Sequence, residues 1–521
     1  MSFEKSKFNF ITREKLKDEQ VSVEQLISGV SMDEIKQVLW LNTIPQLDGI
    51  DVLTKEATLS GKLIVDVVYL DTEDNAQNSQ CTIPFLTKII SEKINSATKI
   101  NATLELASKD FSIHDGKISA VINISLDVVN TNELEVLNSG DENICIKEEN
   151  IISERILLSD CTEFNEEISL PISDNNVKIL SVNCDAVIDD VQIGDNFFTV
   201  QGNIHSKIYF AKNDGENIKI DYISNKDSFR REIEANGIND SMLLDTKISI
   251  KHDNLSYEVD ENEENSNKKI LLNIPLHICY LIFEYINIPC AVDIFSLKNN
   301  LEVITSSYEK TQPQKPICFQ SKVEGNITLA DDEPRIDKIC GISKGWVQTT
   351  NAYIKDSELK VEGIICFEGA YLNDELQKIV CFSKQFPFVV VEKVDATDGV
   401  KIVLKTNLLS LEVVARRGRE IFIDTKLDLC VSIFETHVGA VITDAFVGEP
   451  LPLKEEAIEI YFGKKGEEIW DIAKNMRTKI DVIVLQNSEI ISPLQEDQNI
   501  IIYHQKSPST TSVLSRSDYD F

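Results

Sequence analysis

Basic residues are scarce in this sequence relative to acidic ones. Its 521 residues include 52 Lys and Arg against 86 Asp and Glu, so the formal net charge is −34. Nucleic-acid binding needs a basic surface that neutralises phosphates, so we predict that nucleic acid is not a partner. The same charge argues against electrostatic docking on an anionic membrane. Because 42% of the residues are hydrophobic, packed cores remain possible and wholesale disorder is excluded.

Long uninterrupted hydrophobic runs are also missing. The first twenty residues contain no apolar segment of the kind that a secretory signal needs, so we expect no signal peptide. The most apolar stretch, Leu271–Phe295, contains His277, Glu284 and Asp293. Charged side chains are costly inside a bilayer. We therefore interpret this stretch as paired core strands and predict no membrane span.

Cysteine pairs with C-x-x-C spacing are absent, although the chain has 11 cysteines. Most stand singly in apolar, strand-like runs, as Cys279, Cys366 and Cys430 do. Buried free thiols in a reducing cytosol are the expectation that follows. The alternative is a redox or zinc site, but no Cys and His stand at the usual ligand spacing, so we expect no metal site.

The common catalytic motifs are missing as well, with one exception. Neither the phosphate loop G-x-x-x-x-G-K-[ST] nor the zinc motif H-E-x-x-H occurs. The string Gly341–Gly345 matches G-x-S-x-G, which would make Ser343 a nucleophile, but strand-like residues follow where that motif requires a helix. We interpret it as a tight turn between strands, with a Ser343 esterase as the alternative. The sequence thus predicts neither an enzyme nor a cofactor.

Three segments share one pattern, in which a glycine precedes an apolar strand that ends at a tyrosine. A strand with a phenylalanine follows each of them. Such agreement on both sides of the glycine indicates an internal repeat, and its period is far longer than the ~20–50 residues of a solenoid. The segments are Thr58–Leu70, Phe198–Phe210 and Leu359–Leu372, with Gly61, Gly202 and Gly363, then Tyr69, Tyr209 and Tyr371, then Phe85, Phe229 and Phe388.

The repeats predict a mainly β protein. Long alternating runs rich in Val and Ile, such as Lys117–Val129 and Ile421–Ile433, are typical of half-buried strands. We expect three tandem antiparallel β-sandwich or barrel-like domains, followed by a small βααβ domain. The predicted boundaries are an N-terminal segment 1–20, repeat domains 21–148, 149–305 and 317–447, linkers 306–316 and 448–456, a C-terminal domain 457–505 and a disordered tail 506–521.

One helix is expected in the first repeat domain. Apolar residues recur through Val21–Leu41, where Ser31 is a candidate N-cap and Glu34, three residues later, completes a capping box. Trp40 would then pack in the first domain.

The C-terminal segment 457–505 has a different pattern. A strand at Ile458–Phe462 leads to Gly466, which is predicted to need a positive φ or a close approach. A helix follows with one apolar face, and Asp481 is the candidate N-cap of a second helix. A closing strand at Ile500–Tyr503 can pair with the first. The apolar face of the first helix consists of Ile469, Ile472, Ala473 and Met476, spaced i, i+3, i+4 and i+7.

This segment resembles the LysM module. The matching residues are Gly466, Ile469, Trp470, Ile472, Ala473, Leu485, Asn487 and Gln498. The resemblance implies a core of Trp470, Ile472, Ala473 and Leu485. It also implies a binding surface for N-acetylglucosamine polymers on two loops, which contain Gly466, Glu467, Glu468, Ile469, Asn487, Ile490, Ile491 and Leu494.

The chain departs from the LysM pattern within those loops. Glu467 and Glu468 replace the usual Asp and Thr, and Asp497 replaces a glycine. The added carboxylates should change the shape and hydrogen bonding of the loops. A protein partner is therefore an expectation beside a glycan.

Repeated β-domains followed by a LysM segment resemble the clostridial spore-coat morphogenetic proteins of the SipL type. The resemblance implies a non-catalytic scaffold or adaptor in the mother-cell cytoplasm that encases the forespore. Its partners would be the spore-coat morphogenetic ATPase, SpoIVA, contacted through the LysM domain, and other coat proteins. The alternative is a peptidoglycan-binding protein of the spore cortex or cell wall.

Overall fold

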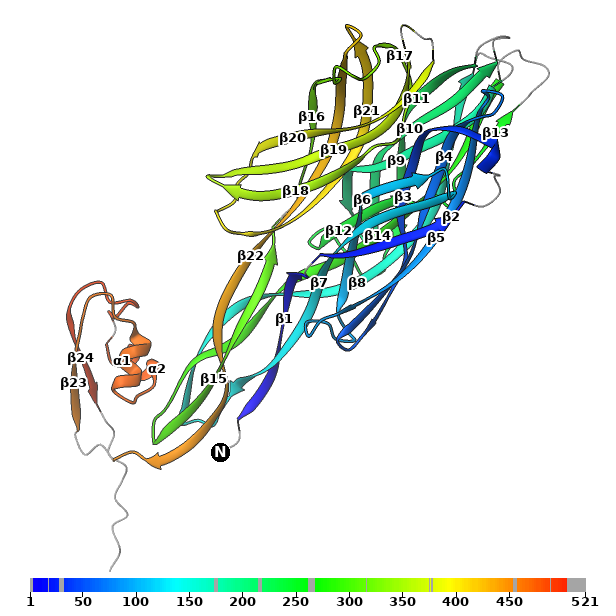
Figure 1. Ribbon diagram of the computed structural model, residues 1–521. Coiled ribbons are helices and arrows are strands. Elements are labelled where there is room, and N and C mark those ends of the chain that lie inside the picture. The colour runs from blue at the N-terminus through cyan, green and yellow to red at the C-terminus, as the bar shows by residue number, and fades with distance from the viewer. Residues whose placement is uncertain are drawn as a thin grey trace, which may run out of the picture.

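The protein is a chain of antiparallel β-sheets with a small helical unit at its C-terminal end (Figure 1). The computed structural model describes residues 3–16, 18–27, 32–172, 177–213, 218–260, 268–314, 316–373, 375, 378–452, 457–487 and 489–503. The prediction of a mainly β chain built from antiparallel sheets is confirmed. The barrel alternative is not confirmed, because no sheet in the described residues closes on itself.

Each repeat consists of two sheets that share one hydrophobic core. In the first repeat, one sheet is built around β7 (Lys117–Ser139), which pairs with β1 (Glu4–Lys15), β2 (Glu19–Leu26) and β6 (Lys99–Ser112). The other sheet has the order β3 (Ile35–Leu53), β4 (Glu56–Asp71), β5 (Ala76–Ile90). Side chains of β4 and β7 meet between the sheets.

The second and third repeats are built in the same way. In the second, β14 (Lys268–Ser296) pairs with β8 (Ile144–Ile172), β12 (Leu243–Ile250) and β13 (Ser256–Asp260), and β10 (Phe197–Asn213) lies between β9 (Val177–Ile193) and β11 (Ile218–Glu234). In the third, β22 (Glu420–Pro450) pairs with β15 (Asn299–Pro313), β16 (Ile317–Thr328) and β21 (Lys401–Arg416), and β19 (Glu358–Asn373) pairs with β17 (Ile336–Ile342), β18 (Trp346–Lys355) and β20 (Ile379–Lys393).

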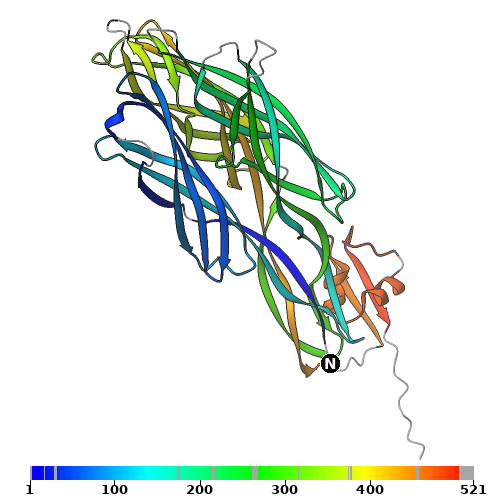
Figure 2. The same cartoon turned by 90° about the vertical axis from the view of Figure 1, so that its right-hand side faces the viewer.

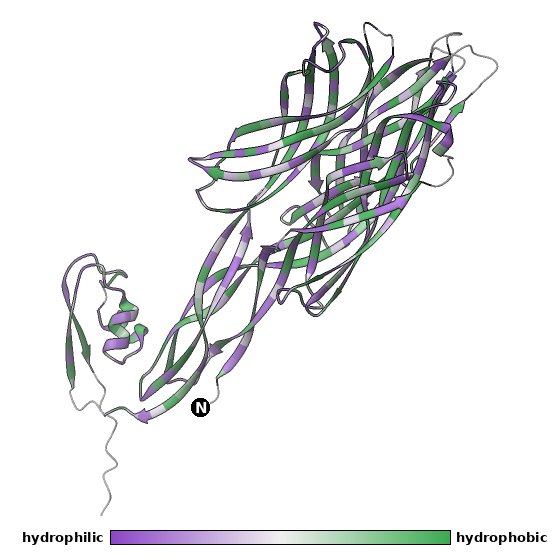
Figure 3. Ribbon diagram, viewed as in Figure 1, coloured by the Kyte–Doolittle hydropathy of each residue, from purple (hydrophilic) through white to green (hydrophobic). Residues whose placement is uncertain are grey.

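Alternating hydropathy explains why these segments form strands. Figure 3 shows hydrophobic and hydrophilic bands along the strands. Side chains of a strand point alternately to its two faces, so an apolar residue at every second position covers one face. In β22, side chains at every second position from Ile421 to Ile433 are fully buried. The expected strand character of Leu271–Phe295 is also confirmed, because this stretch lies within β14.

The repeated glycine lies opposite a phenylalanine of the next strand in all three repeats. A Cβ at Gly363 would lie 2.7 Å from the Phe388 ring and 2.7 Å from the carbonyl oxygen of Gln348. Only glycine lets the ring and the neighbouring strand approach so closely. The predicted pattern therefore reflects packing at the central strands β4, β10 and β19. The opposed pairs are Gly61–Phe85, Gly202–Phe229 and Gly363–Phe388, and Tyr69, Tyr209 and Tyr371 are all buried.

The repeats join in a wide head and a narrow stalk, which Figures 1 and 2 show from two sides. Three two-stranded ribbons build the stalk: β1 with the end of β7, the start of β8 with the end of β14, and β15 with the end of β22. Each repeat thus contributes one ribbon. The stalk core includes Phe8, Val136, Ile151, Cys290 and Val441 from all three.

The head also contains a junction of all three repeats. Trp40 of the first repeat is 1% exposed and its ring centroid lies 5.4 Å from that of Tyr209 in the second. A Cβ at Gly341 of the third repeat would lie 2.6 Å from the Trp40 ring. Trp40 was expected to pack in the first domain, and the structure places it at a junction where it also contacts the second and third repeats.

The helix expected at Val21–Leu41 is wrong. Residues Glu19–Leu26 form β2, Met32–Glu34 form a short 3₁₀ turn, and Ile35 begins β3. Backbone pairing of β2 with β7 and of β3 with β4 takes the hydrogen bonds that a helix would need. The candidate N-cap Ser31 lies outside the described residues.

Three predicted segments are also corrected. The N-terminal segment 1–20 is not separate, because β1 pairs with β7 along the stalk. The linker 306–316 is wrong over its first part, since Ser306–Pro313 belongs to β15. Within the linker 448–456, β22 continues to Pro450, and residues 453–456 lie outside the described part, as does the tail 506–521.

Candidate functional site

The C-terminal unit has the predicted order of elements. β23 (Ile458–Gly463) pairs antiparallel with β24 (Gln498–Tyr503), and α1 (Ile469–Asn475) and α2 (Ile480–Gln486) lie between them in the chain. Of the four residues on the predicted apolar face, Ile472, Ala473 and Met476 are at most 1% exposed, and Ile469 is 6% exposed. The N-cap of α2 is Lys479, so the prediction of Asp481 is wrong; Asp481 lies in the first turn instead.

The predicted core residues of this unit divide into two groups. Trp470, Ile472 and Ala473 are buried, as predicted. Leu485 is 83% exposed, so its core assignment is wrong. The inward residue of α2 is Ile483, and a residue two positions further lies on the opposite side of a helix, at about 100° per residue.

The two predicted loops come together in the structure. The backbone N–H of Gly466 donates to the carbonyl oxygen of Leu494 at 2.8 Å, and Leu494 N–H donates to the Glu467 carbonyl oxygen at 2.9 Å. Ile469 N–H donates to Ser492 Oγ at 3.1 Å. Gly466 has a φ of +88°, which confirms the predicted positive φ.

Other predicted loop residues have structural contacts. Asn487 links the end of α2 to β24: its Nδ2 donates to the carbonyl oxygens of Ile483 and Ile501, and its Oδ1 accepts from Ile501 N–H. Leu494 is 1% exposed, whereas Ile491 is 61% exposed. Ile490 is partly buried against the core of the unit.

The three carboxylates that depart from the LysM pattern all have partners. Glu467 accepts from the Tyr461 hydroxyl at 2.5 Å and from Lys464 N–H at 3.1 Å. Asp497 accepts from Lys465 N–H at 2.7 Å. Glu468 pairs with Lys147 of the stalk, with 2.6 Å between Nζ and Oε2. The departures thus stabilise the loops and join the unit to the stalk.

The unit is docked on the end of the stalk. Figure 2 shows the unit beside the stalk. Trp470 Nε1 donates to Asp293 Oδ2 at 2.7 Å, and Lys474 Nζ donates to Asp293 Oδ1 at 2.7 Å. The Phe295 and Trp470 rings pack edge to face with centroids 5.0 Å apart. Burial opposes ionisation of Asp293, but the hydrogen bonds from Lys474 and Trp470 outweigh it and lower its pKa.

An apolar face remains exposed on the far side of the two-stranded sheet. Side chains alternate along β23 and β24, and the inward ones, such as Ile500 and Ile502, cover the helices. Four outward side chains are apolar although they face solvent, whereas Asn499, opposite Phe462, is exposed and polar. The four are Ile458, Ile460, Phe462 and Tyr503, which are 54%, 52%, 74% and 55% exposed.

The G-x-S-x-G string forms a turn between two strands, as interpreted. Ser343 and Lys344 lie between β17 and β18, so the helix that a nucleophile elbow requires is replaced by a strand. Ser343 is 2% exposed, and its Oγ accepts from Glu368 N–H at 3.0 Å. The Ser343 hydroxyl is therefore used in a structural hydrogen bond. No hydrogen bond in the described part of the chain joins Ser343 to a histidine.

The same turn ties the three repeats together. Lys344 N–H donates to Asn42 Oδ1 of the first repeat at 2.7 Å. Its Nζ lies 2.8 Å from Asp185 Oδ1 of the second and donates to the Cys184 carbonyl oxygen at 3.1 Å. The turn therefore contacts both other repeats through the main chain and the side chain of one residue.

A polar cavity of about 430 Å³ lies beside this turn, between the second and third repeats. Lys207, Lys344 and His205 line it together with Asp185 and Glu412. Burial lowers the pKa of His205 and of Lys207, although Glu412 lies 3.1 Å from Lys207 Nζ.

Two cysteines predicted to be free are disulfide-bonded. Cys279 is bonded to Cys161 across β8 and β14, and Cys430 to Cys318 across β16 and β22. Cys366 is free and buried, as expected.

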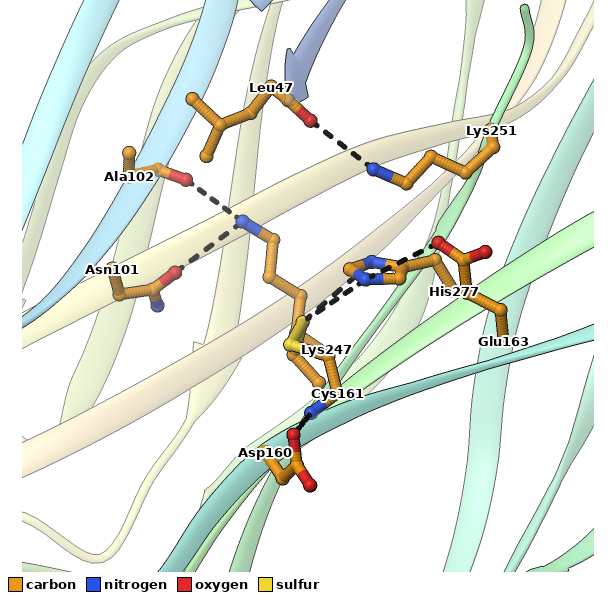
Figure 4. Close-up of a disulfide and its surroundings, with 10 residues drawn as sticks. Leu47, Asn101, Ala102, Asp160, Cys161, Glu163, Lys247, Lys251 and His277 are labelled. Atoms are coloured by element: carbon orange, nitrogen blue, oxygen red, sulfur yellow. Dashed lines mark hydrogen bonds and ion pairs between the residues drawn. A yellow bond between two sulfur atoms is a disulfide. The ribbon is translucent and has the colours of Figure 1, made fainter. Parts of the chain in front are cut away.

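His277 lies beside the first disulfide (Figure 4), and the ligand atoms of Cys161, His277 and Cys279 all lie within 4.8 Å of one another. Sequence reasoning missed this group, although His and Cys at i and i+2 of a strand share one face.

Comparisons with known proteins identify no relative: no protein-family model, curated protein or solved structure matches this chain. In the described part of the chain, no helix combines the length and the apolar character needed to cross a membrane.

Proposed function

We propose that this protein is a non-catalytic scaffold or adaptor of spore-coat assembly. Its three repeats are β-sandwich domains, and its C-terminal unit is a LysM module that docks on the coat morphogenetic ATPase, SpoIVA. It acts in the mother-cell cytoplasm at the forespore surface, where the other coat proteins are further partners. The observation that carries the proposal is the exposed apolar face of β23 and β24, held at one end of the protein.

Exposed apolar side chains in a contiguous group are typical of protein-binding surfaces. Ile460 and Phe462, which share the outward face of β23, are 52% and 74% exposed. Glycan binding relies more on polar groups around aromatic rings, and two of the loop carboxylates here are hydrogen-bonded within the module. The apolar face therefore favours a protein partner.

Side-chain contacts hold the three repeats in one arrangement, which also supports a scaffold. Arg13 in the stalk, Trp40 in the head and the turn at Lys344 each contact all three repeats. The module is joined to the stalk through Asp293, Phe295 and Lys147. Partners bound at separate surfaces would be held at set distances.

A peptidoglycan- or N-acetylglucosamine-polymer-binding protein is the second candidate. A backbone hydrogen bond between Gly466 and Leu494 brings the two predicted loops together, and LysM modules bind glycan at these two loops. This contact favours the second candidate. The joined loops offer one continuous surface, with Ile491 exposed on it.

Two binding measurements on the full chain separate these candidates. One is biolayer interferometry against the purified coat ATPase, and the other is sedimentation with purified peptidoglycan. The scaffold proposal expects saturable binding to the ATPase and none to peptidoglycan. Binding to peptidoglycan without binding to the ATPase would overturn it and favour the second candidate.

A further inference from the structure

The face of the sheet around the first disulfide carries four side chains with metal-binding atoms. Cys161 is directly opposite Cys279 in the register of β8 and β14, and Glu163 is directly opposite His277. The spacing of two residues on each strand places all four on one face. Cys161 is exposed, and His277 and Cys279 are partly exposed, so solutes can reach the group.

One sulfur–nitrogen distance within the group already suits two ligands of a tetrahedral zinc ion. With Zn–S near 2.3 Å and Zn–N near 2.1 Å, tetrahedral ligand atoms lie about 3.6–3.8 Å apart. Cys279 Sγ lies 3.7 Å from His277 Nδ1. His277 Nε2 lies 3.9 Å from Glu163 Oε1. Cys279 Sγ is almost as close to Nε2, at 3.9 Å. Nε2 also lies near the Glu163 carboxylate, which leaves Nδ1 as the nitrogen for a metal, and a carboxylate partner on the other ring nitrogen aligns a zinc-bound histidine.

Two lysines flank the group. Lys247 is directly opposite Cys279 on β12, and Lys251 follows the end of that strand. In Figure 4, Lys247 and Lys251 extend past this group to Ala102 and Leu47 of the first repeat.

We propose that Cys161, Cys279 and His277 form a zinc site when their disulfide is reduced. A thiol reductant supplies two electrons and two protons to break the S–S bond and is itself oxidised to a disulfide. Zinc then displaces the two thiol protons and binds both sulfurs and Nδ1, with water as the fourth ligand. Glu163 is a positioning residue, whose carboxylate would accept a hydrogen bond from Nε2–H once the present 3.9 Å separation closes. Zinc and the disulfide exclude each other, so the site responds to the redox state.

The second disulfide supplies an internal control. Cys318 and Cys430 are also directly opposed, but the pair two positions away is Gln320 and Asp428. No imidazole is therefore present at the position that His277 occupies beside Cys279. This inference does not depend on the proposed function.

The test is a cobalt titration of the full-length protein, reduced with a phosphine and then freed of reductant under anaerobic conditions. Absorption bands of thiolate-bound, tetrahedral Co²⁺ should appear, saturate at one ion per chain and disappear when Zn²⁺ is added. Cys161→Ser and His277→Ala should lose the spectrum, and Cys318→Ser should keep it. Far-ultraviolet circular dichroism checks that each variant folds.

Glu163→Gln should bind about 10–100-fold more weakly while keeping the tetrahedral bands, and Glu163→Asp should restore part of the affinity. The oxidised protein should bind no cobalt at this site. A folded, reduced wild type without thiolate–cobalt bands would overturn the proposal. So would a spectrum that survives in His277→Ala or is lost in Cys318→Ser.

Discussion

Arg13 of the first repeat is hydrogen-bonded to Glu154 of the second inside the stalk. Its Nη2 lies 2.6 Å from Glu154 Oε2, and the two side chains are only 10% and 4% exposed. Arg13 also donates to the carbonyl oxygen of Thr311 and lies over the Phe434 ring of the third repeat, 5.5 Å from its centroid. One side chain therefore contacts all three ribbons of the stalk.

Replacing this arginine should strongly destabilise the stalk. Burial already raises the pKa of Glu154 in spite of the hydrogen bond from Arg13. Arg13→Met would leave a buried carboxylate unpaired, which costs about 3–5 kcal/mol of unfolding free energy. Urea unfolding at pH 7 measures the loss. Lys7→Met is the control, because Lys7 pairs with Glu133 at an exposed site on the same strand, where an ion pair is screened by solvent and its loss should leave stability nearly unchanged. Equal losses in the two variants would contradict the role given to Arg13.

Asp66 should destabilise the fold at neutral pH. Burial raises its pKa to about 6, against about 3.9 for an ordinary aspartate. Between these values the folded state binds a proton that the unfolded state lacks, so stability falls as the pH rises. Asp66→Asn should therefore gain about 1–3 kcal/mol at pH 7–8, and this gain should vanish below about pH 4. Thermal unfolding across pH 4–8 tests this, and a gain independent of pH would contradict it.

The glycine–phenylalanine pairs should behave as coupled sites. Gly363→Ala places a methyl group against the Phe388 ring and the Gln348 carbonyl oxygen, and such overpacking costs about 1–3 kcal/mol. Phe388→Ala removes a buried ring. In the double variant the methyl group loses one of its two clashes, so the combined loss should be smaller than the sum. A double-mutant cycle by denaturant unfolding measures the coupling, and simple additivity would contradict the packing argument.

Asp293 should hold the C-terminal module on the stalk. Asp293→Ala removes the acceptor of both Trp470 Nε1 and Lys474 Nζ. We expect faster hydrogen exchange at the end of β14 and a red-shifted tryptophan emission, while the core around Ile472 keeps its protection. Asp497→Ala is the matched control, since Asp497 accepts from Lys465 within the module. Unchanged exchange in Asp293→Ala would show that other contacts hold the module.

The sequence allowed prediction of features that depend on local pattern. Alternation identified the strands around Ile421–Ile433, and the repeated glycines marked the central strand of one sheet in each repeat. The role of Phe388 beside Gly363 followed from the flanking repeat, although its physical reason, the close approach of a ring, required the structure.

Features that depend on contacts between distant residues were not predictable. The strand at Ile35 contains helix-compatible residues and is decided by pairing with β4. Leu485 matches a core position of the LysM pattern, but Ile483 takes the inward side of α2 here. Arg13 and Glu154 are far apart in the chain, and no local pattern connects them.

The most direct test compares the affinity of the full wild-type chain for the coat ATPase with that of a variant whose exposed apolar face is disrupted. Phe462→Asp places a charge at the most exposed apolar side chain of that face, and Val438→Asp, equally exposed at 74% on β22, is the control. The account predicts that Phe462→Asp weakens binding at least tenfold, while Val438→Asp and the circular dichroism of both variants stay as in the wild type. Unchanged binding of Phe462→Asp, or an equal loss in both variants, would contradict it.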